Sequence, residues 1–211
     1  MKPTLTSKCV LCGDMGVGKT SMIQSYKLKH FSDSTTTTIG AEFCSIDIDF
    51  TNIHYRIHVW DTAGQERFRC MMPLYYRSAD VVIIVTDSSN FNIINRIDYW
   101  IEYIRNETDC SIIIAVNKID LLLESEITTL NDKLDSYRLN GIPIELMSNK
   151  IPTSLNQFFK QSLLNVVKLK RSISTQLITD NESMTMNVDL NDNNIDQNDR
   201  QWGLLSFIGQ C

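Results

Sequence analysis

The sequence predicts an α/β fold in three layers, with a mostly parallel six-stranded sheet between helices. Apolar runs alternate with longer amphipathic stretches over about the first 170 residues, as in strands joined by crossover helices. The third to fifth runs are rich in Val and Ile, which indicates strands buried on both faces. The second and third runs are too close for a helix between them. They therefore predict a hairpin, which places one antiparallel strand at the sheet edge.

The expected elements follow the order β-α-β-β-α-β-α-β-α-β-α, and the hairpin turn falls at Thr51 and Asn52. We expect strands at Leu5–Cys12, Ala41–Phe50, His54–Asp61, Val81–Asp87, Ile112–Asn117 and Ile142–Met147. We expect helices at Lys19–Lys29, Arg67–Tyr76, Asn92–Asn106, Glu126–Leu139 and Thr153–Leu169. This order predicts helices on both faces of the sheet.

Beyond about Arg171 the composition changes, and Asn, Asp, Ser and Thr dominate as far as Gln201. Such a segment has too few apolar residues to build a core. The sequence therefore predicts one domain over residues 1–170 and a flexible, acidic, Asn-rich tail over 171–211 that ends in Cys211. The short apolar patch Trp202–Ile208 either docks on a partner or on the domain, or simply shields the terminus.

Composition limits the class of function. The chain has 211 residues, 43% of them hydrophobic, and a net charge of −5 without a Lys/Arg cluster, which argues against nucleic acid as a ligand. No apolar run is long enough to span a membrane, and the N-terminus lacks the apolar run of a signal peptide. The scattered cysteines indicate reduced thiols in the cytosol. Cys9 and Cys12 form a C-x-x-C pair, which can be redox-active or metal-binding, but their place inside a strand favours core packing.

A phosphate-binding loop is predicted between the first strand and the first helix. The pattern G-x-x-x-x-G-K-[ST] is matched there by Gly13, Asp14, Met15, Gly16, Val17, Gly18, Lys19 and Thr20, followed by Ser21. Glycines let the backbone approach phosphate oxygens, and the helix N-terminus supplies positive potential. Lys19 is expected to bind the β- and γ-phosphates, and Thr20 to ligate Mg²⁺. A chance glycine-rich turn is disfavoured by the complete match in this context.

Two further motifs end strands. Asp61, at the end of the third strand, can hold Mg²⁺ through water, although a lone Asp at a strand end is more often a turn residue. Gly64 can bring a backbone amide to a γ-phosphate, and Gln65 can orient the attacking water as the catalytic residue. Asn117, Lys118 and Asp120 follow the fifth strand. The Asp120 carboxylate can accept two hydrogen bonds from guanine, which adenine cannot donate, so this motif selects GTP over ATP.

Together these motifs resemble those of the Ras superfamily of small GTPases, over about residues 5–170. The resemblance implies that Thr38 ligates Mg²⁺ when the γ-phosphate is present and that Phe31 packs on the guanine. It further implies that the base-binding loop is formed by Ser148, Asn149 and Lys150.

Three segments resemble the Rab family: Ile39–Phe43, Gln65–Arg69 and Tyr75–Ala79. This resemblance implies that effectors bind a surface formed by Ile39, Phe43, Trp60 and Tyr75. Ordinary core packing is the alternative for the three aromatic residues, because most large apolar side chains are buried.

The chain departs from the Rab pattern in three places. Met15 stands where Rabs usually carry a small residue, and we hypothesise that its bulk slows hydrolysis. Asn149 replaces the usual Ala and Met147 the usual Thr; these changes are expected to be tolerated because the key contact is a backbone amide, though they can weaken nucleotide affinity. A single Cys211 stands where Rabs usually have two prenylated cysteines, and the tail is acidic. We therefore expect weak, partner-dependent membrane association.

The resemblance implies a monomeric regulatory GTPase of vesicle traffic that cycles between GTP and GDP with Mg²⁺ and hydrolyses GTP slowly. Its expected partners are an exchange factor, a GTPase-activating protein and effectors. The expected location is the cytoplasm, peripheral to the cytosolic face of an intracellular membrane if Cys211 is lipidated. Two alternatives stay open. One is a hydrolysis-impaired, GTP-bound binding module, suggested by Met15; the other is a P-loop kinase or ATPase, opposed by Asn117, Lys118 and Asp120.

Overall fold

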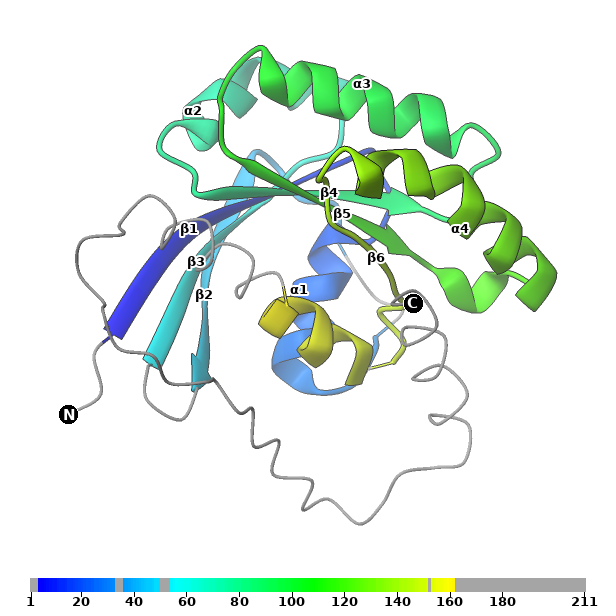
Figure 1. Ribbon diagram of the computed structural model, residues 1–211. Coiled ribbons are helices and arrows are strands. Elements are labelled where there is room, and N and C mark those ends of the chain that lie inside the picture. The colour runs from blue at the N-terminus through cyan, green and yellow to red at the C-terminus, as the bar shows by residue number, and fades with distance from the viewer. Residues whose placement is uncertain (1–3, 33–35, 50–53, 152, 162–211) are drawn as a thin grey trace, which may run out of the picture. The chain divides into compact units, whose positions relative to one another are not determined.

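The six strands form one mixed sheet in the order β2-β3-β1-β4-β5-β6. This computed structural model describes residues 4–32, 36–49, 54–151 and 153–161 (Figure 1). β2 pairs antiparallel with β3, and all other neighbours are parallel, which confirms the predicted sheet. The hairpin turn at 51–52 and the predicted tail lie outside the described residues. The strands are β1 (Thr4–Cys12), β2 (Ala41–Asp49), β3 (His54–Thr62), β4 (Val81–Asp87), β5 (Ser111–Asn117) and β6 (Ile144–Leu146).

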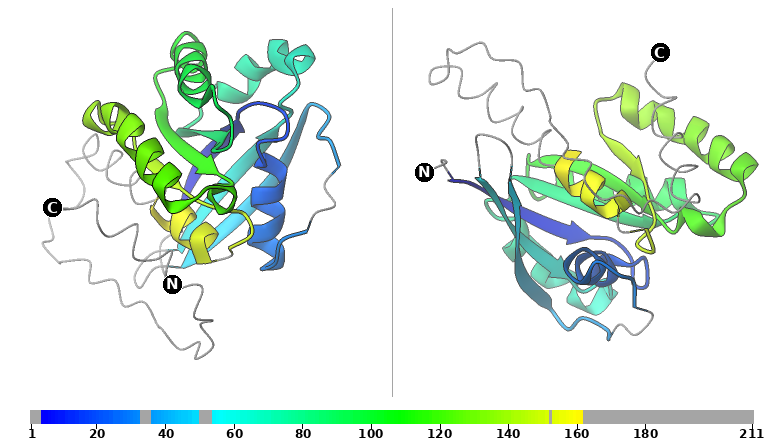
Figure 2. Two further views of the ribbon diagram at one scale, coloured as in Figure 1. Left: turned by 90° about the vertical axis from the view of Figure 1, so that its right-hand side faces the viewer. Right: turned by 90° about the horizontal axis from the view of Figure 1, so that it is seen from below.

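Helices cover both faces of the sheet (Figures 1 and 2). The α-helices are α1 (Lys19–Leu28), α2 (Met72–Tyr76), α3 (Ile93–Arg105) and α4 (Glu124–Leu139), and residues 153–161 are also helical. Two short 3₁₀ helices, η1 (Glu66–Met71) and η2 (Ile119–Leu121), complete the described elements. One core cluster joins α1 and helix 153–161 to the sheet, and a second joins α2, α3 and α4 to its other face.

The expectation that the third to fifth strands are buried on both faces is wrong for the third. Side chains of β4 and β5 are buried along nearly their whole length. In β3, buried residues such as Tyr55 and Ile57 alternate with more exposed ones such as Arg56. The reason is position, because the core cluster under α2, α3 and α4 takes no buried residue from β2 or β3. Within the described residues, this second cluster meets the hairpin only through the partly buried Trp60 of β3.

The predicted helix Arg67–Tyr76 is in fact two elements, η1 and α2. Pro73 stands in the first turn of α2, where a missing N–H costs nothing, so the α-helix begins there. The preceding η1 buries none of its side chains, so packing does not hold it in α-helical geometry. The last predicted helix is helical over 153–161, and its remainder to Leu169 lies outside the described residues.

Cys9 and Cys12 are both buried and free, one in each core cluster. Burial raises the pKa of Cys12 to about 12 and also raises the pKa of Cys9. The described residues contain no group of three or more His, Cys, Asp or Glu side chains suited to a metal ion. Their burial in the two clusters agrees with the expected core packing of Cys9 and Cys12. None of the helices in the described part of the chain has the length and apolar character needed to cross a bilayer.

Candidate functional site

The predicted phosphate-binding loop joins the end of β1 to the start of α1, at the carboxyl ends of the parallel strands. Gly13 has a φ of 137°, and a Cβ there would lie 2.1 Å from the carbonyl oxygen of Val85, so only glycine fits. The loop borders a cavity of about 290 Å³. This first cavity is lined by Met15, Gly16, Gly18, Lys19, Thr20, Ser21, Thr36, Thr37, Thr38, Thr62 and Gly64.

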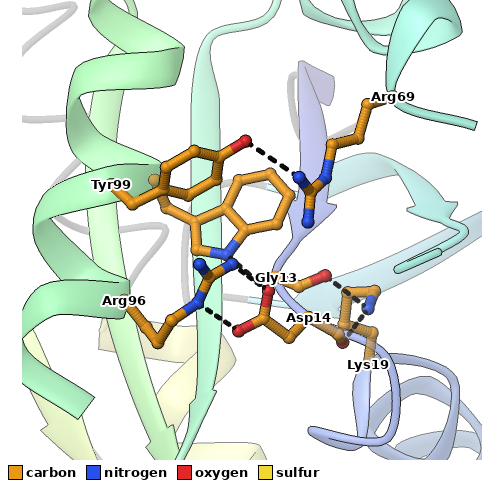
Figure 3. A network of polar contacts seen from close by, with 7 residues as sticks. Gly13, Asp14, Lys19, Arg69, Arg96 and Tyr99 are labelled. Atoms are coloured by element: carbon orange, nitrogen blue, oxygen red, sulfur yellow. Dashed lines mark hydrogen bonds and ion pairs between the residues drawn. The ribbon is translucent and has the colours of Figure 1, made fainter. Parts of the chain in front are cut away.

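The side chain of Lys19 folds back into this loop and is only 6% exposed. Its Nζ donates to the carbonyl oxygens of Gly13 at 2.9 Å and Asp14 at 2.8 Å (Figure 3). Burial lowers the pKa of Lys19, and the charges of Asp61 and Asp14 oppose that shift. An ammonium group held in this way at the cavity wall is suited to bind phosphate oxygens.

The three predicted Mg²⁺ ligands lie together: Thr20 and Thr38 line the first cavity, and Asp61 contacts Thr20. Thr20 Oγ1 donates to Asp61 Oδ2 at 2.6 Å and lies 2.7 Å from Thr38 Oγ1. The second carboxylate oxygen of Asp61, Oδ1, is buried and has no hydrogen-bond partner. Burial raises the pKa of Asp61, against a hydrogen bond from Thr20 and the charge of Lys19. An unpaired buried carboxylate oxygen beside two hydroxyls fits a hard, oxygen-seeking cation such as Mg²⁺.

Gln65 lies immediately before η1 and beside Gly64, which lines the first cavity. Its Nε2 is 3.6 Å from the sulfur of Met15 and donates a weak hydrogen bond to it. Met15 itself is 64% exposed. The methionine therefore extends over the cavity mouth toward the glutamine amide rather than packing into the core.

A second cavity, of about 210 Å³, adjoins the first, because Gly16, Gly18 and Ser21 line both. Its other lining residues come mainly from the predicted base-binding motifs: Phe31, Ser32, Asn117, Lys118, Asp120, Leu121, Ser148, Asn149 and Lys150. The structure thus brings together the motifs that the sequence places far apart. The two adjoining cavities suit a nucleotide, with its phosphates in the first and its base in the second.

Asp120 is fixed by two neighbours in the second cavity. Ser148 Oγ donates to Asp120 Oδ1 at 2.5 Å, and Lys150 Nζ lies 3.0 Å from Oδ2. Burial alone would raise the pKa of Asp120, but the hydrogen bonds from Ser148 and Lys150 outweigh it and hold the pKa below its usual value. Asp120 is therefore a carboxylate at neutral pH, able to accept two N–H donors.

Two amide side chains link the base-binding loops to the phosphate-binding loop. Asn117 Nδ2 donates to the Val17 carbonyl at 2.8 Å, and Asn117 Oδ1 accepts the Asn149 backbone N–H at 3.1 Å. Asn149 is 4% exposed, and its Nδ2 donates to the Gly18 carbonyl at 2.8 Å, while its Oδ1 is buried without a partner. From the sequence we expect the key contact of this loop to be a backbone amide, and we do not foresee this side-chain contact with Gly18.

Other functional candidates were missed from the sequence. Asp87, at the end of β4, forms an ion pair with Lys118 at 2.7 Å. Its place at the end of a buried strand, the feature that also singled out Asp61, could have identified it. Arg96 of α3 binds the side chain of Asp14, which therefore faces α3 and lines neither cavity (Figure 3). Nothing in the sequence pairs these two residues.

Phe43, Trp60 and Tyr75, three of the four predicted effector residues, form one aromatic surface. The ring centres of Phe43 and Trp60 are 5.3 Å apart, and those of Trp60 and Tyr75 are 5.6 Å apart. Phe43 is 51% exposed, Ile39 is more exposed still, and Trp60 and Tyr75 are half-buried. Core packing therefore does not account for Phe43. Cys211 and the patch Trp202–Ile208 lie outside the described residues.

Comparison with known proteins gives a consistent picture. A model of the Ras family matches residues 8–168. The "Ras-related protein Rab5" of Nicotiana tabacum is 33% identical over 157 residues, which cover 74% of this chain and 78% of that protein. The "Ras-related protein Rab-5B" of Plasmodium falciparum (isolate 3D7) is 43% identical over 117 residues, which cover 54% of this chain and 56% of that protein.

Proposed function

Because the chain belongs to the Ras family, as a small GTPase of the Rab type, we propose that it cycles between GTP-bound and GDP-bound states to regulate intracellular membrane traffic. The observation that carries the proposal is the pair of adjoining cavities, one beside Asp120 and the other beside Lys19. A guanine nucleotide needs both cavities, because its base is bound by a hydrogen-bond acceptor and its phosphates by a cation.

In the proposed complex, the base is read by Asp120. Its two carboxylate oxygens accept the N1 and N2 protons of guanine, whereas adenine would leave a partly buried charge unpaired. Phe31 and Lys150 lie next to each other at this cavity, with the Lys150 Nζ 5.9 Å from the Phe31 ring centre. The phenylalanine ring is proposed to pack on the base. Asn117, through its bond to Val17, holds the two loops at a fixed separation.

The phosphates are bound at the N-terminus of α1. Lys19 places its ammonium on the β- and γ-phosphate oxygens, and the backbone N–H groups of the loop supply further donors. Thr20 and Thr38 would hold Mg²⁺ directly and Asp61 would hold it through water. When bound, Mg²⁺ neutralises charge that develops on the phosphates.

Hydrolysis is assigned to Gln65, which orients the attacking water. While the γ-phosphate is present, Thr38 and Gly64 hold their two loops in place; its loss releases both. An effector that binds the aromatic surface of Phe43, Trp60 and Tyr75 then loses the arrangement it recognises. Slow hydrolysis makes an activating protein and an exchange factor necessary for timely cycling, and we propose that the protein acts as a monomer.

Nucleotide competition tests this proposal directly. The full chain is loaded with a fluorescent GDP analogue in the presence of Mg²⁺, and unlabelled GTP, GDP or ATP is added. GTP and GDP are expected to displace the probe, and ATP is not. Displacement by ATP at similar concentrations would instead favour a P-loop kinase or ATPase.

A second candidate function rests on the contact between Met15 and Gln65. If the sulfur holds the amide away from water, the protein is a GTP-bound binding module with little catalysis of its own. Single-turnover hydrolysis by the wild type, beside Gln65→Leu, separates the two functions. A wild type as inactive as Gln65→Leu favours the binding module, and a faster wild type favours the cycling switch.

Attachment to the cytosolic face of a membrane is proposed to be peripheral and weak, through Cys211. Fractionation of cells that express the wild type or Cys211→Ser tests this. The wild type is expected to divide between membrane and cytosol, and the variant to leave the membrane. Equal membrane binding by both proteins would rule out Cys211 as the attachment point.

A further inference from the structure

Helix α3 contacts the phosphate-binding loop through hydrogen bonds to the side chain of Asp14. Arg96 Nε donates to Asp14 Oδ2 at 2.7 Å, Arg96 Nη2 donates to Asp14 Oδ1, and Trp100 Nε1 donates to the same oxygen at 3.3 Å (Figure 3). Asp14 and Arg96 side chains are each 27% exposed, so the pair is largely shielded from water. A two-pronged guanidinium–carboxylate contact fixes orientation as well as distance, which a single hydrogen bond does not.

The same face of α3 holds the segment that follows Gln65. Arg69 of η1 donates from Nη1 to the Tyr99 hydroxyl at 3.1 Å, and its carbonyl oxygen accepts the Tyr103 hydroxyl at 3.0 Å. The guanidinium of Arg69 also lies over the Tyr99 ring, 5.3 Å from its centre. Residues 96, 99, 100 and 103 are spaced three and four apart, so they share one side of the helix.

On the N-terminal side of Gln65, the backbone of Gly64 packs against the phosphate-binding loop. A Cβ at Gly64 would lie 2.6 Å from the carbonyl carbon and oxygen of Asp14 and 2.6 Å from Lys19 Nζ. The backbone of residue 64 is therefore packed directly on the peptide that Arg96 fixes. Gln65 stands between two points held by α3: the Gly64–Asp14 contact before it and Arg69 after it.

We infer that Arg96 is a positioning residue for GTP hydrolysis, which fixes the phosphate-binding loop relative to Gln65 through Asp14. Tyr99 and Tyr103 complete the same support by holding Arg69. The inference rests on the proposed GTPase function. Its chemical basis is geometric, since a misplacement of about 1 Å in a catalytic group can cost on the order of 100-fold in rate. Nucleotide affinity depends mainly on Lys19 and Asp120, which Arg96 does not touch.

The test compares Arg96→Gln with Arg56→Gln, a matched control. Arg56 also forms a two-pronged contact with a carboxylate, through Nε at 2.7 Å and Nη2 at 3.2 Å from Asp47, but on the β2–β3 hairpin. Single-turnover hydrolysis of preloaded GTP, GDP affinity and the thermal midpoint are measured for both. Each variant is also made in a Met15→Ser background, so that a slow wild type does not hide the effect.

We expect Arg96→Gln to lower the hydrolysis rate by about tenfold or more, with GDP affinity changed by less than about threefold. Arg56→Gln should leave the rate unchanged. Arg96→Lys, which keeps the charge but not the planar fork, should stay well below the wild-type rate. Tyr99→Phe removes only the hydroxyl that binds Arg69 and should lower the rate by a smaller factor.

Unchanged hydrolysis in a folded Arg96→Gln would overturn the inference. So would a fall in rate that merely follows a loss of bound nucleotide. Should Arg96→Gln not fold, Tyr99→Phe and Arg96→Lys decide the question by the same measurements. Failure of the proposed function looks different: the wild type then fails to bind GTP, or Gln65→Leu hydrolyses GTP as fast as the wild type in both backgrounds.

Discussion

The side-chain amide of Gln65 donates a hydrogen bond to the sulfur of Met15, across a distance of 3.6 Å. Thioether sulfur is a weak acceptor, so the contact is easily exchanged for one with water, but its bulk stays at the cavity mouth. Whether Gln65 can orient the attacking water depends on both the weakness of this hydrogen bond and the bulk of the Met15 side chain.

Replacing Met15 by Ser should therefore accelerate hydrolysis. A smaller side chain frees the Gln65 amide and opens space for the attacking water. We expect a gain of about tenfold, equal to about 1.4 kcal/mol in the barrier, in single-turnover experiments. Gln65→Leu added to Met15→Ser should abolish the gain. An unchanged rate in Met15→Ser would show that the methionine is harmless.

Replacing Asp120 by Asn should change the base that is preferred. The amide keeps an acceptor for the N1 proton, but it meets the guanine 2-amino group with a second donor. We expect GTP affinity to fall by roughly 100-fold or more, while xanthosine triphosphate, which carries an oxygen at that position, gains affinity. Competition binding measures both affinities, and Asp132→Asn, at an exposed position of α4, serves as the control. Retained preference for GTP would contradict this assignment of Asp120.

Asn149 offers a test of the link between the two cavities. In Asn149→Asp the donor to the Gly18 carbonyl is lost and a buried negative charge faces that oxygen. We expect GDP to dissociate at least about tenfold faster, because an unpaired buried charge costs more than about 1.4 kcal/mol. Asn149→Ala should have a smaller effect, since it removes a hydrogen bond and an unsatisfied oxygen together. Equal dissociation rates for the Asp and Ala variants would refute this account.

Asp87 predicts a pH dependence of stability. Burial alone would raise the pKa of Asp87, but hydrogen bonds from Lys118 and Ser89 outweigh it and hold the pKa below its usual value. A lowered folded-state pKa stabilises the protein above the unfolded-state pKa, near 4, and this contribution disappears as the pH falls through the folded-state pKa. At pH 7 the free energy of unfolding of the wild type should exceed that of Asp87→Asn by about 0.5–1 kcal/mol. The difference is small because the ion pair of Asp87 and Lys118 is partly exposed. Thermal unfolding of the GDP-loaded proteins between pH 3 and 7 measures the difference, which should vanish at the acid end; a gap that persists there would have another cause.

Measurements of stability distinguish an exposed aromatic surface from core packing as the role of Phe43. Phe43 is half exposed, so Phe43→Ala should lower the free energy of unfolding by less than about 1 kcal/mol. Phe159 is fully buried in the core cluster of α1, and Phe159→Ala should cost about 3–5 kcal/mol. Chemical denaturation compares the two. A loss in Phe43→Ala as large as that in Phe159→Ala would restore the core interpretation.

The sequence predicted best where the determinants are local. The bounds of β4 were predicted to the residue, because its continuous Val and Ile run is unambiguous. Gly16, Gly18, Lys19 and Asp120 of the predicted motifs line the two cavities. The sequence does not predict the division into η1 and α2. This division depends on tertiary packing, because η1 has no buried side chain to hold it in α-helical geometry.

Contacts between distant residues were beyond reach for a different reason. Arg96 binds Asp14 across 82 residues, and Asn149 binds Gly18 across 131. Arginine on an amphipathic helix looks like any other solvent-facing charge until the fold places a partner beside it. Such pairs are fixed by topology rather than by local pattern.

The lack of any buried side chain in η1 has a thermodynamic consequence. Its amide hydrogens should exchange with solvent through local opening, at a free-energy cost well below that of global unfolding. The segment that follows Gln65 is thus largely separate from the segments that keep the domain folded. Substitutions there are expected to alter the proposed switching without reducing the amount of folded protein in the cell.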